Sequence, residues 1–598
     1  MKLVIPYSGA VHVADTRLVR LAEFLGAQCE LLHVEPGVTL SPEFLEKRVT
    51  DKNSCFVLNP SEIQQWLSSE SFPPSLASYL TSQFPFVLIH NLSLDLFSSS
   101  ILSTFSGGTL QSVSPIENPG LGYEVASEPK SICGAFSGLN FGSVDVANDR
   151  VLVENPIGSD IRTHITIGGN PFFASTQRDR AEVFFLAGAN MADVDASMRP
   201  ELLSKAFSQL IPPAMFIRYA FREECWRPGA HHATLIIDDP LLRETYGFLD
   251  FESLLGLMDK DKFHTCIAFI PHNWRRNASR IIRIFRERPD RFSICFHGND
   301  HTGGEFAAKD ASLLNTMLTV AEERMAVHER QTGVPCDKVM VFPQGKFSRN
   351  AMNVLKAHNF LAAVNSGAYA RGEDIHFNLA ELLEPAILKY GGFPLFLRKY
   401  VRKIAAEDIA FDLFFGKPVF IVEHHEIFKD PPSLTELTSR IYSRAPDIIW
   451  SNLRTAVQNA HLTRRAPDGT LEVRAYANGG TIKNTSDSPI RCRVEWPGPN
   501  AILVQGILLD GALCTDAQSD EKGVRLCFDL PPGGSRAFSI VHQNNYGSSD
   551  ANNTVPYTTK AFLRRRLSEF RDNHVSKSPR LLAMLKRFRK RSRKNPKA

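Results

Sequence analysis

The sequence predicts an α/β protein with a central (β/α) barrel, an N-terminal α/β domain and a C-terminal β-sandwich. Strand-like and helical stretches alternate over about the first 200 residues. The middle of the chain repeats apolar runs that end in polar residues, and a later part alternates apolar and polar residues. Alternating strands and helices are typical of parallel sheets, and a period of two is typical of half-buried strands.

The N-terminal segment, residues 1–205, begins with a βαβ pattern. "MKLVIPYS" reads as a strand, "DTRLVRLAEFLGAQ" has helical spacing, and "CELLHVEP" returns as a strand. We therefore expect a Rossmann- or flavodoxin-like domain, with a β-rich extension from about residue 130. This pattern also leaves open a nucleotide-sugar-binding domain of the glycosyltransferase type, since many functions share it.

Six apolar runs recur across residues 212–460, with helical stretches between them. They read ATLIID, HTCIAFIP, RFSICFH, KVMVFPQ, LAAVNSG and KPVFIVEH. Functional groups of a (β/α) barrel lie at the carboxyl ends of its strands. The polar residues that end these runs therefore predict a barrel, closed or partly open, with its working face at that end.

Residues 461–545 alternate every second position and turn at Asn-Gly and Asp-Ser, which predicts the β-sandwich. Residues 546–598 read as a linker and a basic amphipathic tail. From Lys560 onward the net charge is +13, against +4 for the whole chain. Such a tail favours an anionic membrane surface; other polyanions, or simple solvation, are the alternatives. From residue 579 onward the tail has a single aromatic residue, Phe588, among its many cations, too few for a base-stacking segment, so no specific nucleic acid is expected.

The start of the chain and its apolar runs bear on localisation. The first apolar run is about three residues long before a proline, too short for a signal peptide. No apolar stretch approaches the ~18 residues of a membrane span. We therefore expect a cytoplasmic protein, with the tail placing it at the inner membrane surface as an option.

Polar residues that could hold a metal follow several of the predicted barrel strands. Asp238 and Asp239 end one strand, and His297 and His301 follow another. Adjacent carboxylates at a strand end are costly unless they meet a cation or a proton. The simpler alternatives are a helix N-cap for the Asp pair and an ordinary loop for the imidazoles. Glu305 either hydrogen-bonds a ligand imidazole or is a solvated loop carboxylate.

The order of these motifs resembles the polysaccharide deacetylase (NodB-homology, carbohydrate esterase 4-like) superfamily. Asp-Asp comes first, then H-x-x-x-H, a Pro-x-Gly turn and a late strand that ends in His. "HGNDH" is closest to the branch with an H-G-x-x-H motif. The resemblance covers about residues 230–430 and implies a barrel of the glycoside hydrolase/deacetylase type.

The resemblance implies a metal site. Its ligands would be Asp239, His297 and His301. An Asp-His-His set suits Zn²⁺ best, with Co²⁺, Ni²⁺ or Mn²⁺ as alternatives, and leaves positions for water and substrate.

It also implies catalytic roles. Asp238 corresponds to the general base and His424 to the general acid, with His425 as the alternative acid. The Pro-x-Gly turn places Gln344 where a backbone N–H faces the oxyanion.

Two departures accompany the resemblance. The turn at Pro343 lacks the arginine that orients the base in the family, and Lys346 and Arg349 are the nearby substitutes. Gly298 stands where the family usually has Ser or Thr.

The sequence therefore predicts a metal-dependent carbohydrate deacetylase that hydrolyses N- or O-acetyl groups on a polysaccharide or glycan precursor. The alternative is a catalytically lapsed, deacetylase-like carbohydrate-binding module in polysaccharide biosynthesis. The missing arginine favours this alternative, whereas the retained Asp and His residues favour an enzyme.

Overall fold

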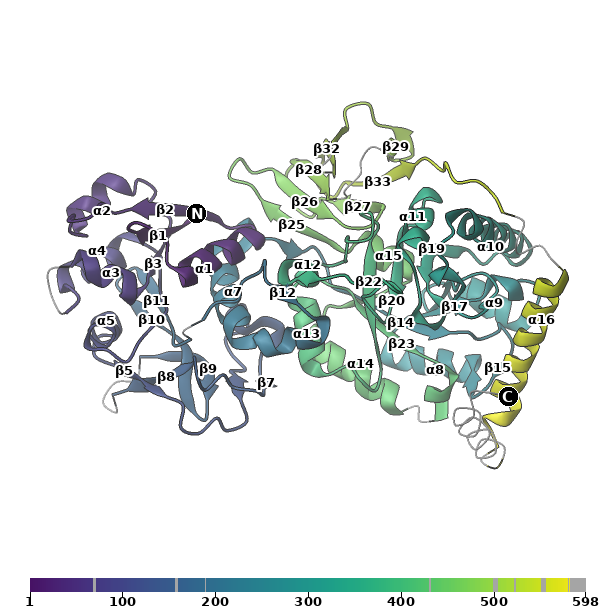
Figure 1. Cartoon of the computed structure of the whole chain (residues 1–598), viewed down its shortest axis with the longest axis horizontal. Coiled ribbons are helices and arrows are strands. Elements are labelled where there is room, and N and C mark those ends of the chain that lie inside the picture. Colours follow the sequence, from purple (N-terminus) through teal and green to yellow (C-terminus); the bar gives the residue numbers. More distant parts are fainter. Residues whose placement is uncertain are drawn as a thin grey trace.

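The computed structural model describes residues 1–67, 71–155, 160–188, 190–429, 432–497, 504–520, 523–549, 555–578 and 580 (Figure 1). None of the helices within these residues is both long enough and apolar enough to cross a bilayer.

Seven parallel strands close into a barrel. Their ring order is β14 (His232–Asp238), β17 (Thr265–Phe269), β18 (Phe292–Phe296), β19 (Cys336–Val341), β20 (Ala362–Asn365), β22 (Leu395–Tyr400) and β23 (Val419–Glu423). β14 closes the ring by pairing with both β17 and β23. The structure agrees with the predicted barrel and shows it closed. Six strands match the six apolar runs, and the seventh, β22, comes from a stretch that the pattern did not single out.

Side chains alternate between the inside and the outside of this barrel. Ile236, Cys295, Phe396 and Phe420 share one core cluster with the short helix α15 (Leu453–Gln458), whereas their strand neighbours pack against the surrounding helices. Successive side chains of a strand point to opposite faces. The inward face therefore continues to four polar residues: Asp238, His297 and Arg398 lie two positions further on, and His424 lies four positions after Phe420.

A nine-stranded sheet lies in the N-terminal part of the chain. Its first five strands in spatial order run parallel, namely β2 (Gln28–His33), β1 (Lys2–Tyr7), β3 (Cys55–Leu58), β4 (Phe86–Ile89) and β11 (Ala181–Leu186). The remaining four are antiparallel: β10 (Asn170–Arg178), β9 (Arg162–Ile167), β6 (Tyr123–Val125) and β7 (Asn140–Phe141). The apolar core of this segment continues into α12 (Leu379–Leu383) and α13 (Ala406–Phe414) of the barrel. Shared core residues thus join the two parts.

Two sheets after the barrel pack around a separate apolar core that includes Trp496. One contains β13 (Arg227–Pro228), β25 (His461–Arg465), β26 (Leu471–Ala475), β28 (Ile490–Trp496), β32 (Gly523–Leu530) and β31 (Gln518–Asp520). The other contains β27 (Gly479–Lys483), β33 (Ser535–His542), β29 (Val504–Leu509) and β30 (Ala512–Leu513). β13 precedes the barrel in sequence, so one sheet joins residues from both sides of it. The domain limits given above stay predictions.

The chain then returns to the barrel. Helix α16 (Val555–Phe570) and the π-helical turn η10 (Arg571–Val575) lie beside α9 (Ser279–Glu287) and β15 (Thr245–Tyr246), far from the N-terminal sheet (Figure 1). Tyr246 donates a hydrogen bond to Asp572, and Arg276 forms an ion pair with Glu569. The part of the predicted tail from residue 581 onward lies outside the described residues.

Candidate metal centre

Asp239, His297 and His301 meet at one mouth of the barrel. Asp239 follows the last residue of β14, and the two histidines follow β18. Oδ1 of Asp239 lies 3.4 Å from Nε2 of His297 and 3.2 Å from Nε2 of His301. One ligand atom from each of the three residues lies within 4.8 Å of the others. The structure therefore brings the three predicted ligands together.

The surroundings of these side chains fit a bound divalent ion. Oδ1 of Asp239 is buried without a hydrogen-bond partner in the described residues, so this lone pair is available to a cation. Nδ1 of His297 lies 2.9 Å from the carbonyl oxygen of Val341. A hydrogen bond from Nδ1 to a carbonyl leaves Nε2 free as a ligand, which is the usual arrangement around a metal-bound histidine. The donor set is thus oriented for an ion such as Zn²⁺.

Burial and neighbouring charges shift the pKa values of these groups. Burial disfavours the charged form of Asp239, but the imidazoles of His301 and His297 hold its pKa well below its usual range. Burial also opposes charge on His297, yet Asp238 and Asp239 raise its pKa. Burial lowers the pKa of His301 to about 4. His301 is therefore neutral at pH 7, which is the form that binds metals.

Glu305 holds the loop between the two histidines. Its carboxylate accepts backbone N–H groups from Asn299 at 2.6 Å, Asp300 at 3.2 Å, His301 at 3.1 Å and Thr302 at 3.2 Å. Both sequence interpretations of Glu305 were wrong, because this buried side chain binds the loop backbone and no ligand imidazole. A carboxylate that accepts several N–H groups is a strong local organiser.

Gly298 lies at a crowded, left-handed position of this loop, with φ of +67°. A Cβ here would overlap the carboxylate of Glu305 and the ring of Pro343. Both the conformation and the space therefore require glycine. The carboxylate of Glu305 occupies the space that a Ser or Thr side chain at this position would need.

Replacing Gly298 by alanine is expected to destabilise the protein by about 1–3 kcal/mol, because backbone strain and overpacking add. It should also weaken binding of Zn²⁺ by displacing His297 or His301. Denaturant unfolding and Zn²⁺ titration measure the two effects. Gly256→Ala is the control: Gly256 is an exposed helical residue with open space around it, so it should gain stability. Equal behaviour of the two variants would contradict the role of Gly298.

Asp238 forms a buried, bidentate ion pair with Arg398. Nη1 and Nη2 of Arg398 each lie 2.7 Å from one carboxylate oxygen. Burial opposes the charge of Asp238, but Arg398 holds the pKa of this carboxyl below its usual value. Asp238 is therefore an oriented carboxylate at neutral pH, directly beside the three ligand side chains.

The arginine that pairs with Asp238 is Arg398 on strand β22, whereas the family resemblance places such an arginine at the turn near Pro343. Arg349 forms an ion pair with Glu373, and Lys346 lies 3.4 Å from the side-chain oxygen of Gln344. The suggestion that Lys346 or Arg349 fills this place was therefore wrong. Arg398 was missed because the β22 strand itself went unrecognised.

The two late histidines lie in different environments. His424 lines the cavity at the barrel mouth together with Asp238 and Asp239. His425 stacks on Phe248 and lies 3.7 Å from Asp572, and it does not line this cavity. Strand alternation explains the difference, because His424 continues the inward face of β23 and His425 the outward face.

The cavity itself has a volume of about 850 Å³. Gln344 lines it in a left-handed conformation with φ of +58°. Asp239 and His301 are also left-handed, at +79° and +56°. Such conformations are uncommon outside glycine and tend to gather at functional sites. One wall is formed by four residues of the C-terminal segment: Arg564, Arg565, Ser568 and Arg571.

Comparison with known proteins gives likenesses to solved structures alone, since no family model and no curated protein matches the chain. Agd3, described as a novel carbohydrate deacetylase, has a TM-score of 0.48 and 10% identity over 90% of this chain and 98% of its own. A family 4 carbohydrate esterase from Streptomyces lividans, in complex with acetate, has a TM-score of 0.23 and 12% identity over 38% and 93%. A family 4 acetyl xylan esterase from Clostridium thermocellum, in complex with a cobalt ion, has a TM-score of 0.22 and 15% identity over 36% and 86%.

These proteins are named as carbohydrate deacetylases and esterases, the same class that the sequence motifs resemble. None of them distinguishes the branch with the H-G-x-x-H motif. Each of these TM-scores is below 0.5, so we infer function from the geometry of the site.

Proposed function

We propose that this chain is a metal-dependent carbohydrate deacetylase that hydrolyses N- or O-acetyl groups on a polysaccharide or glycan precursor. The observation that carries the proposal is the convergence of Asp239, His297 and His301 beside the Asp238–Arg398 pair. These residues come from three separate strands and meet at the carboxyl end of the barrel, where such folds place their chemistry.

Asp239, His297 and His301 would hold the ion, which is Zn²⁺ in our proposal, with Co²⁺, Ni²⁺ or Mn²⁺ as alternatives. A bound divalent ion lowers the pKa of water and polarises an acyl oxygen. The remaining steps fall to the side chains around it.

Asp238 acts as the general base and accepts a proton from the attacking water, while Arg398 holds its carboxylate in place. His424 donates a proton to the leaving amine or alkoxide. The backbone N–H of Gln344 donates a hydrogen bond to the oxygen that becomes negative.

Acetate release tests the proposal. The full chain, loaded with Zn²⁺, is incubated with N-acetylated and O-acetylated oligosaccharides, and acetate is measured with a coupled enzyme assay. Release by the wild type, and its loss in Asp238→Asn, supports the proposal. Tight binding of the same oligosaccharides without any release would instead support the lapsed, carbohydrate-binding alternative.

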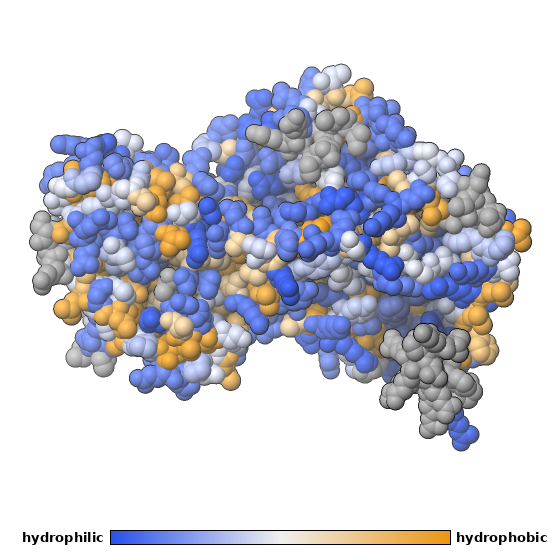
Figure 2. Space-filling view, in the orientation of Figure 1, coloured by the Kyte–Doolittle hydropathy of each residue, from blue (hydrophilic) through white to orange (hydrophobic). Residues whose placement is uncertain are grey.

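We also propose that the outward face of α16 binds an anionic membrane surface. Large apolar side chains on this helix are strongly exposed, including Leu567 at 68% and Leu563 at 53%. Figure 2 shows apolar side chains gathered at the edge of the molecule where α16 lies. Lys560 and Arg566 flank this stripe, and the basic residues from 580 onward follow it. Apolar side chains and cations on one helix face suit an anionic lipid surface.

Replacing Leu563 and Leu567 together by aspartate is expected to reduce binding to phosphatidylserine vesicles by at least about tenfold, because two apolar anchors are lost and two like charges are added. Vesicle co-sedimentation measures the effect. Leu121→Asp is the control, since this leucine is 71% exposed but belongs to the N-terminal segment. Binding by the double variant at the wild-type level would contradict the proposal.

A further inference from the structure

Helix α16 is fixed against the barrel mouth and forms one wall of the cavity that contains the candidate ligands. The hydroxyl of Tyr557 lies 3.0 Å from that of Thr302 and 3.2 Å from a carboxylate oxygen of Asp300, the two residues that flank His301. Tyr246 binds Asp572 at the other end of the segment, at 2.7 Å. The helix is therefore placed by contacts at both ends, and the charges on its inner face belong to the site.

Arg565 is the central cation of this wall; the charges of Asp239 and Glu305 favour its charged form, but neither carboxylate forms an ion pair with it. Its side chain is 7% exposed, and no carboxylate in the described residues forms an ion pair with it. Its Nη2 lies 3.4 Å from Nδ1 and 3.3 Å from the carbonyl oxygen of His301, and its Nε has no hydrogen-bond partner there. A buried guanidinium is costly unless it is paired. Arg565 thus presents unused hydrogen-bond donors beside the metal centre.

Metal binding would remove one of the few partners that Arg565 has. When Nε2 of a neutral imidazole binds a metal, its proton lies on Nδ1, and Nδ1 then cannot accept a hydrogen bond. His297 is arranged for this, because its Nδ1 faces a carbonyl oxygen. Nδ1 of His301 faces a guanidinium instead. With the metal bound, Arg565 would lose this acceptor and lie next to a second positive charge, so an anion bound between them would be stabilised.

Arg564 adds a second cation to the same wall. It lies one residue before Arg565, lines the cavity and is half-buried. No ion pair involves it among the described residues. Two neighbouring guanidinium groups match the oxygens of a carboxylate or phosphate.

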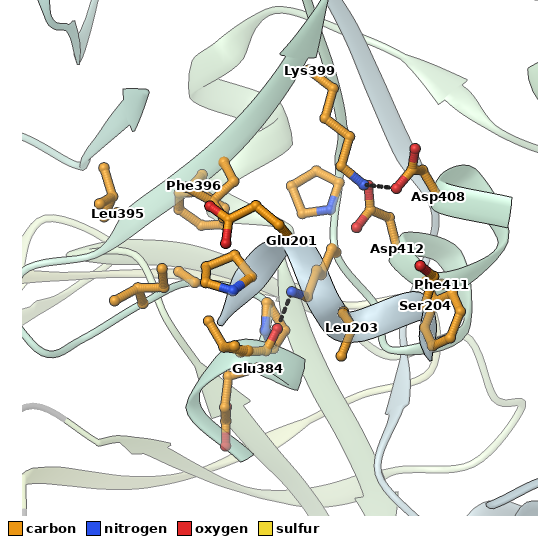
Figure 3. A pocket seen from close by; sticks show the side chains of 18 residues that line it. Glu201, Leu203, Ser204, Glu384, Leu395, Phe396, Lys399, Asp408, Phe411 and Asp412 are labelled. Atoms are coloured by element: carbon orange, nitrogen blue, oxygen red, sulfur yellow. Dashed lines mark hydrogen bonds and ion pairs between the residues drawn. The ribbon is translucent and has the colours of Figure 1, made fainter. Parts of the chain in front are cut away.

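A smaller cavity of about 160 Å³ between the N-terminal segment and the barrel provides a contrast (Figure 3). Its cation Lys399 lies 3.2 Å from Asp408 and 3.1 Å from Asp412. A second cation there, Lys417, donates to the carbonyl oxygen of Leu382. The cations in that cavity therefore have close partners in the protein, whereas Arg565 forms no ion pair with a described residue.

We propose that Arg565 and Arg564 form an anion-binding subsite, and that the carbohydrate accepted here carries a carboxylate or phosphate close to its acetyl group. That the ligand is an acetylated carbohydrate rests on the proposed deacetylase function. The anion-binding subsite itself is inferred only from the unpaired guanidinium groups. The anion would bind α16 while the acetyl group lies at the metal centre.

Matched substrates test the proposal with the full, Zn²⁺-loaded chain. They are an acetylated disaccharide that contains a uronic acid, its neutral methyl ester, and a counterpart with a 6-phosphate. The wild type should prefer an acid over the ester by about 10- to 100-fold, mainly through KM, since a charge-assisted pair is strong. Arg565→Gln and Arg564→Gln should reduce this preference, and Arg566→Gln, an exposed neighbour on the same helix, should keep it.

Of the two acidic substrates, the uronic acid and the 6-phosphate, the one with the lower KM shows whether the subsite prefers a carboxylate or a phosphate. Equal turnover of acid and ester by the wild type would overturn the proposal, and so would an equal loss on both substrates in Arg565→Gln.

Direct binding separates this proposal from the deacetylase function. The full, Zn²⁺-loaded chain is titrated calorimetrically with the deacetylated uronic acid disaccharide. Wild-type binding that weakens at least about tenfold in Arg565→Gln supports the subsite even if no acetate is released from any carbohydrate. Equal affinity of the wild type and Arg565→Gln, or no binding to the wild type, would overturn the subsite even if acetate release is observed.

Discussion

Replacing Asp239 by alanine is expected to abolish binding of a divalent ion and, with it, acetate release. The wild type should hold about one equivalent of Zn²⁺, because two imidazoles and one carboxylate are a typical ligand set of catalytic zinc sites. Removing the carboxylate leaves two neutral ligands. Loss of a residue that only hydrogen-bonds a metal ligand lowers metal affinity by up to ~100-fold, so loss of a ligand itself should lower the Zn²⁺ affinity by more than that. His297→Ala should behave in the same way.

Plasma emission spectroscopy on the dialysed protein measures the metal content, and far-UV circular dichroism shows whether the fold persists. His376→Ala is the matched control, since the His376 side chain is 77% exposed and lies outside the cavity. The same metal content in Asp239→Ala and in the wild type would refute the assigned metal centre.

Replacing Arg398 by methionine should destabilise the fold and inactivate the site together. The change leaves Asp238 as a buried carboxylate without its partner, and breaking a buried ion pair costs about 3–5 kcal/mol. Activity should fall by roughly 10²–10⁴-fold, the range typical of general acid–base catalysis, because protonated or misplaced Asp238 cannot act as a base. Denaturant unfolding and acetate release measure the two effects.

A double variant separates stability from catalysis. Combining Asp238→Asn with Arg398→Met removes both charges, so most of the lost stability should return while activity stays absent. Arg349→Met is the control, because Arg349 is half exposed and pairs with Glu373; its stability should stay within about 0.5 kcal/mol of wild type. If Arg349→Met loses activity and Arg398→Met does not, the assignment of the orienting arginine is wrong.

The barrel, and the meeting of Asp239, His297 and His301 at one of its mouths, could be predicted from the sequence because both follow from where the strands end; their role as metal ligands came from the family resemblance and stays a prediction. Buried parallel strands read as apolar runs, and their carboxyl ends meet at one edge. Strand β22 was not recognised because its sequence, "LFLRKY", contains two cations and therefore resembles a solvent-exposed stretch. Only closure of the ring shows that Phe396 and Arg398 share its inner face.

Two further features differed in how far the sequence could predict them. Alternation along β23 could have separated His424 from His425, because Phe420 and His424 are an even number of residues apart. The docking of α16 could not be predicted in this way. Its inner face is made of Tyr557, Ala561 and Arg565, so hydrophobic periodicity gives no signal there. Polar contacts with a distant loop determine its position.

The wall that α16 supplies also has a consequence for how the chain matures. Translation proceeds from the N-terminus, so every strand of the barrel leaves the ribosome before residues 555–578 are made. Domains fold as units during synthesis. Until the last helix emerges and docks, the three candidate ligand side chains lack this wall of the cavity, which would give an incoming ion a direct route to them.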